Sequence, residues 1–414
     1  MQAQSVKPNT RTFSIAVRSC TCLSSVFQVH SQILKLGHNS DSYAVSSLVH
    51  SYSNFGEPVL ARRVFDESPN KNVVCWTTLV SGYCLNGLID EAREVFDSMS
   101  DRNDVSYSAM ISGYVQNECF DEAIELFRNL KSCQNMKPNV SLLVSVLSAC
   151  ANVGAFEEGK WIHNYIHEND FRYELKIGTA LIDFFSKCGY VMIGYEVFSQ
   201  MPYKDVATWS AMIQGLAFNG NNNLALELFE MMEKVGPRPN AVTFIGVLTA
   251  CNHKEWLNEA WRIFGRMSKV YGIFPTIQHY SCMVDLLARA GQVREAEVLI
   301  NVMPMVPDGA IWGSLLNGCV MHGHVELGEK VGELLIQIEP ERGGRYVLLA
   351  NMHATAGSWD DVVRLRKMMK ERKIVTGPGW SFIEIDGHVH RFLAGDKSHP
   401  QWADVYKILD QFQS

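Results

Sequence analysis

Two short motifs contain the residues best suited to metal chemistry. His324-Val325-Glu326 has the His-x-Glu spacing that zinc deaminases use to activate water, and His388 and His390 alternate as they would on one face of a strand. A zinc deaminase also needs a later Cys-x-x-Cys pair, but the sequence contains no such pair and no cysteine follows Cys319. We therefore expect no catalytic residue, no metal site, no cofactor and no enzymatic activity.

The chain contains eleven cysteines. Four of them follow Ser, Ala or Gly and occupy the same place in the repeat described below: Cys20, Cys150, Cys251 and Cys319. An odd number of cysteines without a pairing pattern is typical of a reducing compartment, where a free cysteine behaves as a small hydrophobic residue. We expect these four side chains to be buried.

The composition indicates a folded, helix-rich chain. Apolar residues make up 47% of it and there are 13 prolines among 414 residues, which argues against extended disorder. No window of about 18 uninterrupted apolar residues occurs, so we expect no membrane-spanning segment. The net charge of −7 gives no global attraction to a polyanion, although a local groove can still bind one.

A repeat determines which elements position any site. Ser81–Phe96 reads SGYCLNGLIDEAREVF, and Ser112–Phe127 reads SGYVQNECFDEAIELF. Aligning such stretches gives units of 31 to 36 residues that begin at Ser42, Val73, Asp104, Val140, Leu175, Val206, Ala241, Ile277, Gly309 and Gly343. An incomplete unit precedes them from Thr10.

Each unit has the pattern of two helices joined by a turn. The fifteenth residue is glycine except in two units, which have Glu118 and Glu255, and glycine there ends a helix in the left-handed conformation. The twentieth residue, where a small side chain lets helices approach, is alanine in six units: Ala61, Ala92, Ala123, Ala225, Ala260 and Ala296. One helix pair cannot cover its own apolar face, so the repeat predicts an all-α solenoid with a row of equivalent side chains.

The repeat residues resemble those of a known family. The stretches VVCWTTLVSGY, DVSYSAMISGY and VATWSAMIQGL, with MKPN at 136–139 and PRPN at 237–240, resemble plant organellar pentatricopeptide repeats. Tetratricopeptide repeats would require W-x-x-L-G-x-x-Y early in the unit. The resemblance extends from Thr10 to the end, and the mixed unit lengths are similar to those of the subclass with P, L and S repeats. It implies a right-handed α-solenoid that binds single-stranded RNA of an organelle.

In that family one unit reads one RNA base through its fifth and last residues. The resemblance implies six pairs that each combine a hydroxyl residue with Asn or Asp: Ser46 with Asn72, Thr77 with Asn103, Ser108 with Asn139, Thr179 with Asp205, Ser210 with Asn240, and Ser281 with Asp308. The two long units differ, with Val144 and Glu174 in one and Ile245 and Thr276 in the other.

The resemblance also assigns bases to these pairs. A hydroxyl with Asn favours adenine and a hydroxyl with Asp favours guanine, so the expected target from the unit at Ser42 is A-A-A-any-G-A-any-G. Second residues such as Val74, Val105 and Ala207 would flank the bases. Ser, Thr, Asn and Asp at these places could instead serve only as helix caps. Capping alone does not explain why the long units, which also need caps, lack the pairs.

The sequence changes character after Asp308. Residues 309–376 resemble the E-type units that follow the RNA-reading repeats of editing factors, and 377–414 resembles the E-plus extension. The resemblance thus divides the chain into an incomplete L-type repeat at 1–41, reading repeats at 42–308 and these two regions. Alternation around Asp386-Gly387 predicts a β-hairpin, and Trp402–Phe412 predicts a short helix.

Together these features imply a specificity factor that selects sites for C-to-U editing of organelle transcripts. Because the chain itself lacks the zinc signature, its E-type region would recruit a DYW-type deaminase protein and other editing factors in trans. A basic run would contact RNA backbone or that partner, or form a solvated helix face: Arg364, Arg366, Lys367, Lys370, Arg372 and Lys373.

Two other functions stay open. A factor for organelle RNA stabilisation, splicing or translation would share every repeat feature but leave the E-type region unexplained. A scaffold that binds proteins is disfavoured by the regular pairs. The acid-poor start, in which Asp41 is the first acidic residue, suits an organelle transit peptide, although the repeat begins near Thr10. We expect a mitochondrial location, with the chloroplast as the alternative.

Overall fold

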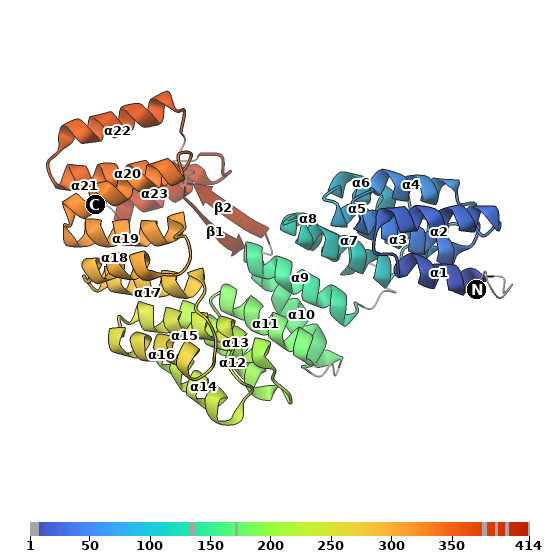
Figure 1. Cartoon of the computed structure of the whole chain (residues 1–414), viewed down its shortest axis with the longest axis horizontal. Helices are drawn as coiled ribbons and strands as arrows, with labels where there is room; N and C mark the ends of the chain where they lie inside the picture. The colour runs from blue at the N-terminus through green and yellow to red at the C-terminus, as the bar shows by residue number, and fades with distance from the viewer. Residues whose placement is uncertain are drawn as a thin grey trace. The chain divides into compact units, whose positions relative to one another are not determined.

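The computed structural model describes residues 8–131, 138–169, 173–374, 379–385, 388–393 and 397–412. The chain divides into an N-terminal body, Met1–Arg172, and a C-terminal body, Tyr173–Ser414, whose elements are labelled in Figure 1. Within the described residues each body is a stack of helix pairs, and the C-terminal body adds a two-stranded hairpin and a final helix. The prediction of an all-α chain with a C-terminal hairpin is therefore confirmed.

The bounds of the elements follow the repeat. The N-terminal body contains α1 (Thr10–Arg18), α2 (Leu23–Lys35), α3 (Ser42–Asn54), α4 (Pro58–Glu67), α5 (Val73–Leu85), α6 (Ile89–Asp97), α7 (Asp104–Gln116), α8 (Phe120–Lys131), α9 (Val140–Val153) and α10 (Phe156–Glu168). The C-terminal body contains α11 (Leu175–Lys187), α12 (Val191–Gln200), α13 (Val206–Phe218), α14 (Asn222–Val235), α15 (Ala241–His253), α16 (Leu257–Lys269), α17 (Ile277–Arg289), α18 (Val293–Val302), α19 (Gly309–His322), α20 (Val325–Ile338), α21 (Gly343–Thr355), α22 (Trp359–Glu371), β1 (Trp380–Ile385), β2 (His388–Leu393) and α23 (Trp402–Phe412).

The odd-numbered helices from α3 to α21 are the first helices of their units, and each begins at the residue that the alignment predicts. The turn after each of them contains a residue with positive φ, which is glycine in eight units. Glu118 and Glu255 occupy the same place with φ of 61° and 55°. A residue with a Cβ adopts this conformation at a cost in free energy. The geometry of the repeat therefore overrides the local preference of both glutamates.

First helices stack directly on the first helices of neighbouring units, as α3, α5 and α7 do. The glycine of the Ser-Gly-Tyr triplet makes this approach possible. A Cβ atom on Gly82 would lie 2.2 Å from Ser53 Oγ, and one on Gly113 would lie 2.1 Å from Cys84 Sγ. A larger side chain at either of these two glycines would clash with the preceding first helix unless that helix moved.

An asparagine near the end of several first helices ties neighbouring units together. Asn86 Nδ2 donates to Ser53 O at 3.0 Å, and Asn219 Nδ2 donates to Ser186 O at 2.8 Å. The accepting carbonyls belong to the last turn of the preceding first helix, where each also accepts from the N–H of the turn glycine, Gly56 or Gly189. The asparagine bonds therefore add a second donor to each carbonyl and join neighbouring units.

The side chains predicted to let helices approach are buried. All six alanines at the twentieth place are 0% exposed. Cys150, Cys251 and Cys319 are also buried, and burial raises the pKa of Cys251 to about 12 and that of Cys319 to about 11. The prediction is wrong for Cys20, which is half-buried, because α1 ends at Arg18 and leaves Cys20 in the following loop.

The hairpin pairs β1 with β2 in antiparallel register, from Trp380 opposite Leu393 to Ile385 opposite His388. Its predicted turn, Asp386-Gly387, lies outside the described residues, as do Met136-Lys137 of the MKPN stretch and the predicted boundary at 376 and 377. The helix predicted after the hairpin is α23. No helix among the described residues is long and apolar enough to cross a bilayer.

Candidate nucleic-acid interface

The predicted pairs lie at the N-terminal ends of the first helices. Each fifth residue follows the first turn of its helix, and each last residue directly precedes the next first helix. Consecutive first helices are packed against each other within each body. The two residues of a pair therefore belong to one edge of the stack, and the pairs repeat along that edge.

One pair and both of its flanking residues share a cavity in the N-terminal body. The cavity has a volume of about 410 Å³, and its lining includes Thr77, Asn103, Val74 and Val105. The two valines are 55% and 54% exposed. The site thus has two open apolar side chains together with a hydroxyl and an amide. A second cavity, of about 500 Å³, is lined by Ser46 and Val74 among others.

All six predicted last residues cap the helix that follows them. Asn103 Oδ1 accepts from Ser106 N at 3.0 Å, and Asp205 Oδ1 accepts from Thr208 N at 2.9 Å. The other four make the same kind of bond: Asn72, Asn139, Asn240 and Asp308. All six residues therefore do serve as helix caps, but a cap occupies only one oxygen of each side chain.

The cap decides which group of the side chain is left over. A capping asparagine keeps its Nδ2 amide, which can only donate, and a capping aspartate keeps Oδ2, which can only accept. Asn72, Asn103 and Asp308 are exposed, as is Asn240. Asn139 is half-buried, and its Nδ2 lies 3.4 Å from Asp104 Oδ2. Asparagine and aspartate units thus offer opposite hydrogen-bonding groups.

The fifth-position hydroxyls differ in how open they are. Thr77 is half-buried, and its Oγ1 donates to Val73 O at 2.7 Å. Ser108, Thr179 and Ser281 are also half-buried. Ser46 and Ser210 are only 7% and 2% exposed, so these two side chains lie beneath the surface. Of the three predicted flanking residues, Ala207 is exposed like the valines.

The last residues of the long units behave differently. Thr276 Oγ1 is 2.8 Å from both Gln278 Oε1 and His279 Nδ1, so its hydroxyl is engaged within its own turn. His279 is fully buried, and burial lowers its pKa, which favours the neutral ring. Glu174 makes no side-chain cap to α11. The incomplete first unit contributes Asp41, which caps α3.

The unit at Gly309, predicted to be the first E-type unit, has the same helices but a different fifth position. Its fifth residue is Gly313, and a Cβ atom there would lie 2.3 Å from Arg345 Nη1. Arg345 donates from Nε to Glu339 Oε2 at 2.8 Å and from Nη2 to Gly309 O at 2.7 Å. A guanidinium held by two partners thus occupies the space that a fifth side chain would need.

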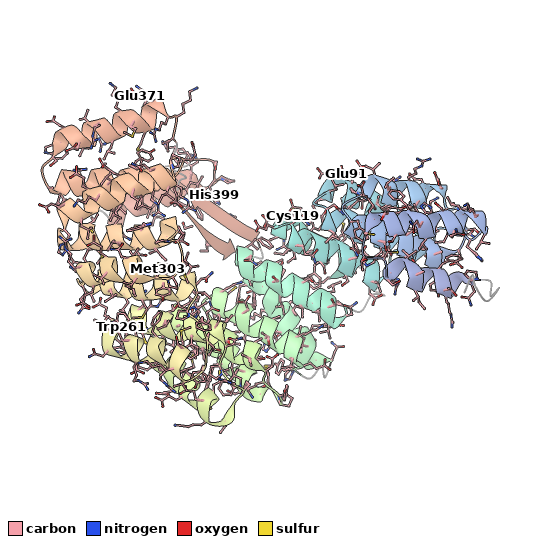
Figure 2. The ribbon with its side chains drawn as sticks, in the orientation of Figure 1. Glu91, Cys119, Trp261, Met303, Glu371 and His399 are labelled. Atoms are coloured by element: carbon pink, nitrogen blue, oxygen red, sulfur yellow. The ribbon has the colours of Figure 1, made fainter. Side chains whose placement is uncertain are left out.

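The metal motifs gain no further ligands among the described residues, where no group of three His, Cys, Asp or Glu side chains lies close enough to hold an ion. His324 and Glu326 are the N-cap and an early residue of α20. His390 Nδ1 lies 2.9 Å from Nε2 of His399, which Figure 2 labels beside the hairpin. The side chain of His388 lies outside what the structure describes.

Half of the basic run, which occupies α22 and the two residues after it, has partners within 309–376. Arg364 Nη2 lies 3.1 Å from Asp361 Oδ1, and Arg372 Nη1 donates to Tyr346 Oη at 2.7 Å. Lys367 Nζ lies 3.9 Å from Glu371 Oε1. These interactions support a solvated helix face for that part of the run.

The sequence alone did not point to three side chains that shape this edge. Thr208 and Thr243 hydrogen-bond to members of the predicted pairs, and Arg345 fills the fifth position of the E-type unit. Threonine at the third place of a unit is visible in the sequence, but its partners come from two different helices. Gly313 at the fifth place was the sequence feature that could have indicated that another side chain, here that of Arg345, fills this space.

Comparison with family profiles places the chain among known repeat proteins. A profile described as PPR repeat matches residues 70–100, a second with that description matches 105–134 and 279–305, and the PPR repeat family matches 204–253. A pentatricopeptide repeat domain matches 238–289, and an E motif matches 322–384.

Curated relatives from Arabidopsis thaliana match nearly the whole chain. It is 46% identical to pentatricopeptide repeat-containing protein At5g66520, over 97% of this chain and 65% of that protein. It is 41% identical to At2g20540, with coverage of 98% and 77%. The chain therefore belongs to the pentatricopeptide repeat family, and it carries an E motif. It is also 44% identical to chloroplastic ELI1, of which it covers 64%.

The chain spans between 52% and 65% of the length of At5g66520, At1g08070 and ELI1. Relatives include proteins named as chloroplastic and as mitochondrial. Among solved structures, PPR10 in complex with an 18-nt psaJ RNA element has a TM-score of 0.61 at 13% identity, covering 91% of this chain and 65% of that one. PPR10 from maize has a TM-score of 0.52 at 17% identity, covering 90% and 55%. At these identities the likeness concerns the fold, a solenoid of helix pairs.

Proposed function

We propose that this chain is a sequence-specific single-stranded RNA-binding factor that selects sites for C-to-U editing of organelle transcripts. The proposal rests above all on the cavity that contains Thr77, Asn103, Val74 and Val105. A flat base fits between two apolar side chains when its edge can hydrogen-bond to polar groups beside them. Membership of a family whose member PPR10 has been crystallised with RNA supports the same function.

The groups left over by the caps account for base preference. Asparagine Nδ2 donates to the N1 acceptor of adenine, whereas aspartate Oδ2 accepts from the N1–H and N2–H₂ donors of guanine. Read from the unit at Ser42, the target is A-A-A-any-G-A-any-G. Six contacts of about 1–3 kcal/mol each would give recognition that is adequate rather than stringent. Ser210 supports Asn240 from beneath the surface, through Thr243.

The editing step is assigned to a partner. The E motif at 322–384 supports a role in editing, and the chain carries no deaminase signature of its own. The E-type and E-plus regions recruit a DYW-type deaminase protein in trans, while the repeats hold the RNA. The chain works in an organelle, with the mitochondrion favoured over the chloroplast.

Sequencing plastid and mitochondrial transcripts from plants that lack this protein tests the proposal. We expect one or more cytidines to lose C-to-U conversion, each shortly downstream of a stretch that matches the predicted register. Full-length protein should restore conversion, and the Asn103→Ala variant should restore it poorly. If every site stays edited while one transcript falls in abundance, the chain acts in RNA stabilisation and the editing proposal is wrong.

A further inference from the structure

Thr208 connects the two members of a predicted pair. Its Oγ1 lies 2.9 Å from Thr179 Oγ1, the fifth residue of the unit at Leu175, and donates to Oδ1 of Asp205, the last residue, at 2.9 Å. Thr208 is the third residue of α13 and is 0% exposed. The three side chains thus form a continuous relay that begins at a half-buried hydroxyl and ends at a helix cap.

The relay has only one possible direction. A carboxylate oxygen can only accept, so the proton of Thr208 Oγ1 points to Asp205. The bond between the two threonines must then use the proton of Thr179. Two groups are left for a ligand at this unit, namely the oxygen of Thr179 and Oδ2 of Asp205, and both are acceptors.

The next unit repeats the arrangement with asparagine. Ser210 Oγ lies 2.7 Å from Thr243 Oγ1, and Thr243 Oγ1 donates to Asn240 Oδ1 at 3.1 Å. Thr243 N also donates to Asn240 Oδ1 at 3.0 Å. Two donors on Oδ1 fix the orientation of the amide, so that Nδ2 is the group left over. Because Ser210 is buried, it acts on a ligand only through Asn240.

A pair in the N-terminal body is built without this connection. There Thr77 Oγ1 donates to Val73 O in its own helix, and Ser106 Oγ, at the place equivalent to Thr208, donates to Asn103 O at 2.8 Å. The cap at Asn103 and the hydroxyl of Thr77 are therefore held separately. This pair offers a matched control within the same chain.

We propose that Thr208 and Thr243 are specificity-positioning residues, because each joins the fifth and last residues of the preceding pair into a relay that fixes the hydrogen-bonding groups offered to a base. This inference rests on the proposed RNA-binding function. The relay at Thr208 presents two acceptors, which match the adjacent N1–H and N2–H₂ donors of guanine. The relay at Thr243 presents an amide donor, which matches N1 of adenine.

Removing the hydroxyl of Thr208 or Thr243 should weaken the preference between guanine and adenine at the corresponding nucleotide. In Thr208→Val the proton of Thr179 is free to point at the base, so adenine and guanine become more equal. In Thr243→Val one of the two donors that hold Asn240 Oδ1 is lost, so the orientation of the amide is less strictly fixed and the preference for adenine weakens. Both variants keep the backbone donor of the cap, and valine closely matches threonine in shape. Each variant should therefore fold, which thermal unfolding would verify.

The test uses the purified full chain and synthetic RNAs that contain AAAUGAUG, with the second, fifth or sixth nucleotide replaced by each other base. Wild type should prefer guanine at the fifth place and adenine at the sixth. Thr208→Val should reduce the fifth-place preference by about two- to tenfold and leave the sixth unchanged, and Thr243→Val should do the reverse. Thr208→Ser and Thr243→Ser should restore the preferences, and Ser106→Ala should leave the second-place preference intact.

The possible results separate the two proposals. If wild type discriminates and both valine variants keep its preferences, the relay proposal is wrong while the RNA-binding function stands. A uniform loss of affinity for every RNA, without a change in preference, would also reject the relay, because it indicates a structural role. If wild type itself shows no base preference, the proposed function fails and the relay proposal fails with it.

Discussion

Two units of the C-terminal body share one architecture and differ at their fifth and last residues. The unit at Val206 has a hydroxyl at its fifth place and Asn240 at its end, and a buried threonine connects them. The E-type unit at Gly309 has Gly313 at its fifth place, covered by Arg345, and Arg342 at its end. Both units keep a positive-φ glycine after the first helix, at Gly220 and Gly323.

The difference teaches that the fold and the interface are separable in this chain. A positive-φ turn, small residues and apolar faces build the helix pairs, whether or not a pair offers hydrogen-bonding groups. A few side chains at the N-terminal end of the first helix then decide what the unit presents. We therefore expect substitutions in the reading units to change base preference, and substitutions around Arg345 to change stability.

The largest effect should come from exchanging the last residue of a reading unit. Asp205→Asn keeps the cap to Thr208 N but replaces the free carboxylate oxygen with an amide. The preference at the fifth nucleotide should move from guanine to adenine, by about 2–3 kcal/mol in the ratio of the two affinities. Titration of the two RNAs by fluorescence anisotropy measures this ratio. An unchanged preference for guanine would show that Asp205 is a cap and nothing more.

A smaller effect, on stability alone, should follow from Arg345→Ala. The substitution removes a half-buried guanidinium from Glu339 and from Gly309 O, so the free energy of unfolding should fall by about 2 kcal/mol. Arg342→Ala is the control, because Arg342 is 67% exposed and its Nη1 lies 3.5 Å from Glu339 Oε1. Denaturant titration measures both variants. A change of base preference in Arg345→Ala would contradict the claim that the unit at Gly309 does not contribute to base preference.

The smallest effect should separate capping from reading at one residue. Asn103→Ala removes the cap of α7 and should cost about 1 kcal/mol of stability, whereas Asn103→Ser keeps a capping oxygen and should restore most of it. Neither variant has the amide, so both should lose preference for adenine at the second nucleotide. Recovery of that preference in Asn103→Ser would mean that the amide does not contact the base.

Much of the fold could be predicted because each unit repeats the same local sequence features, namely a turn glycine, a small residue and helical spacing of apolar residues. Every first helix from Ser42 onward begins where the alignment placed it, and the turn even holds at Glu118, where no glycine marks it. Cys20 was misjudged because α1 is shorter than its counterparts and ends at Arg18.

The interface could be predicted only in part. The positions of the pairs follow from the resemblance to the repeat family, and their capping role follows from residue type. The relays through Thr208 and Thr243 and the cover at Gly313 could not be foreseen, because each depends on side chains of two helices meeting in space. Nor could counting residues show that Ser46 and Ser210 are buried while Thr77 is half-open.

The central claim is that six pairs, and not the units between them, read bases. The most direct test is to measure the affinity of the purified chain for RNA containing AAAUGAUG and for each single-nucleotide variant, at one fixed salt concentration. The account predicts that changes at the fourth and seventh nucleotides are tolerated, while changes at the other six weaken binding. Equal effects at all eight nucleotides, or no effect at any of them, would contradict it.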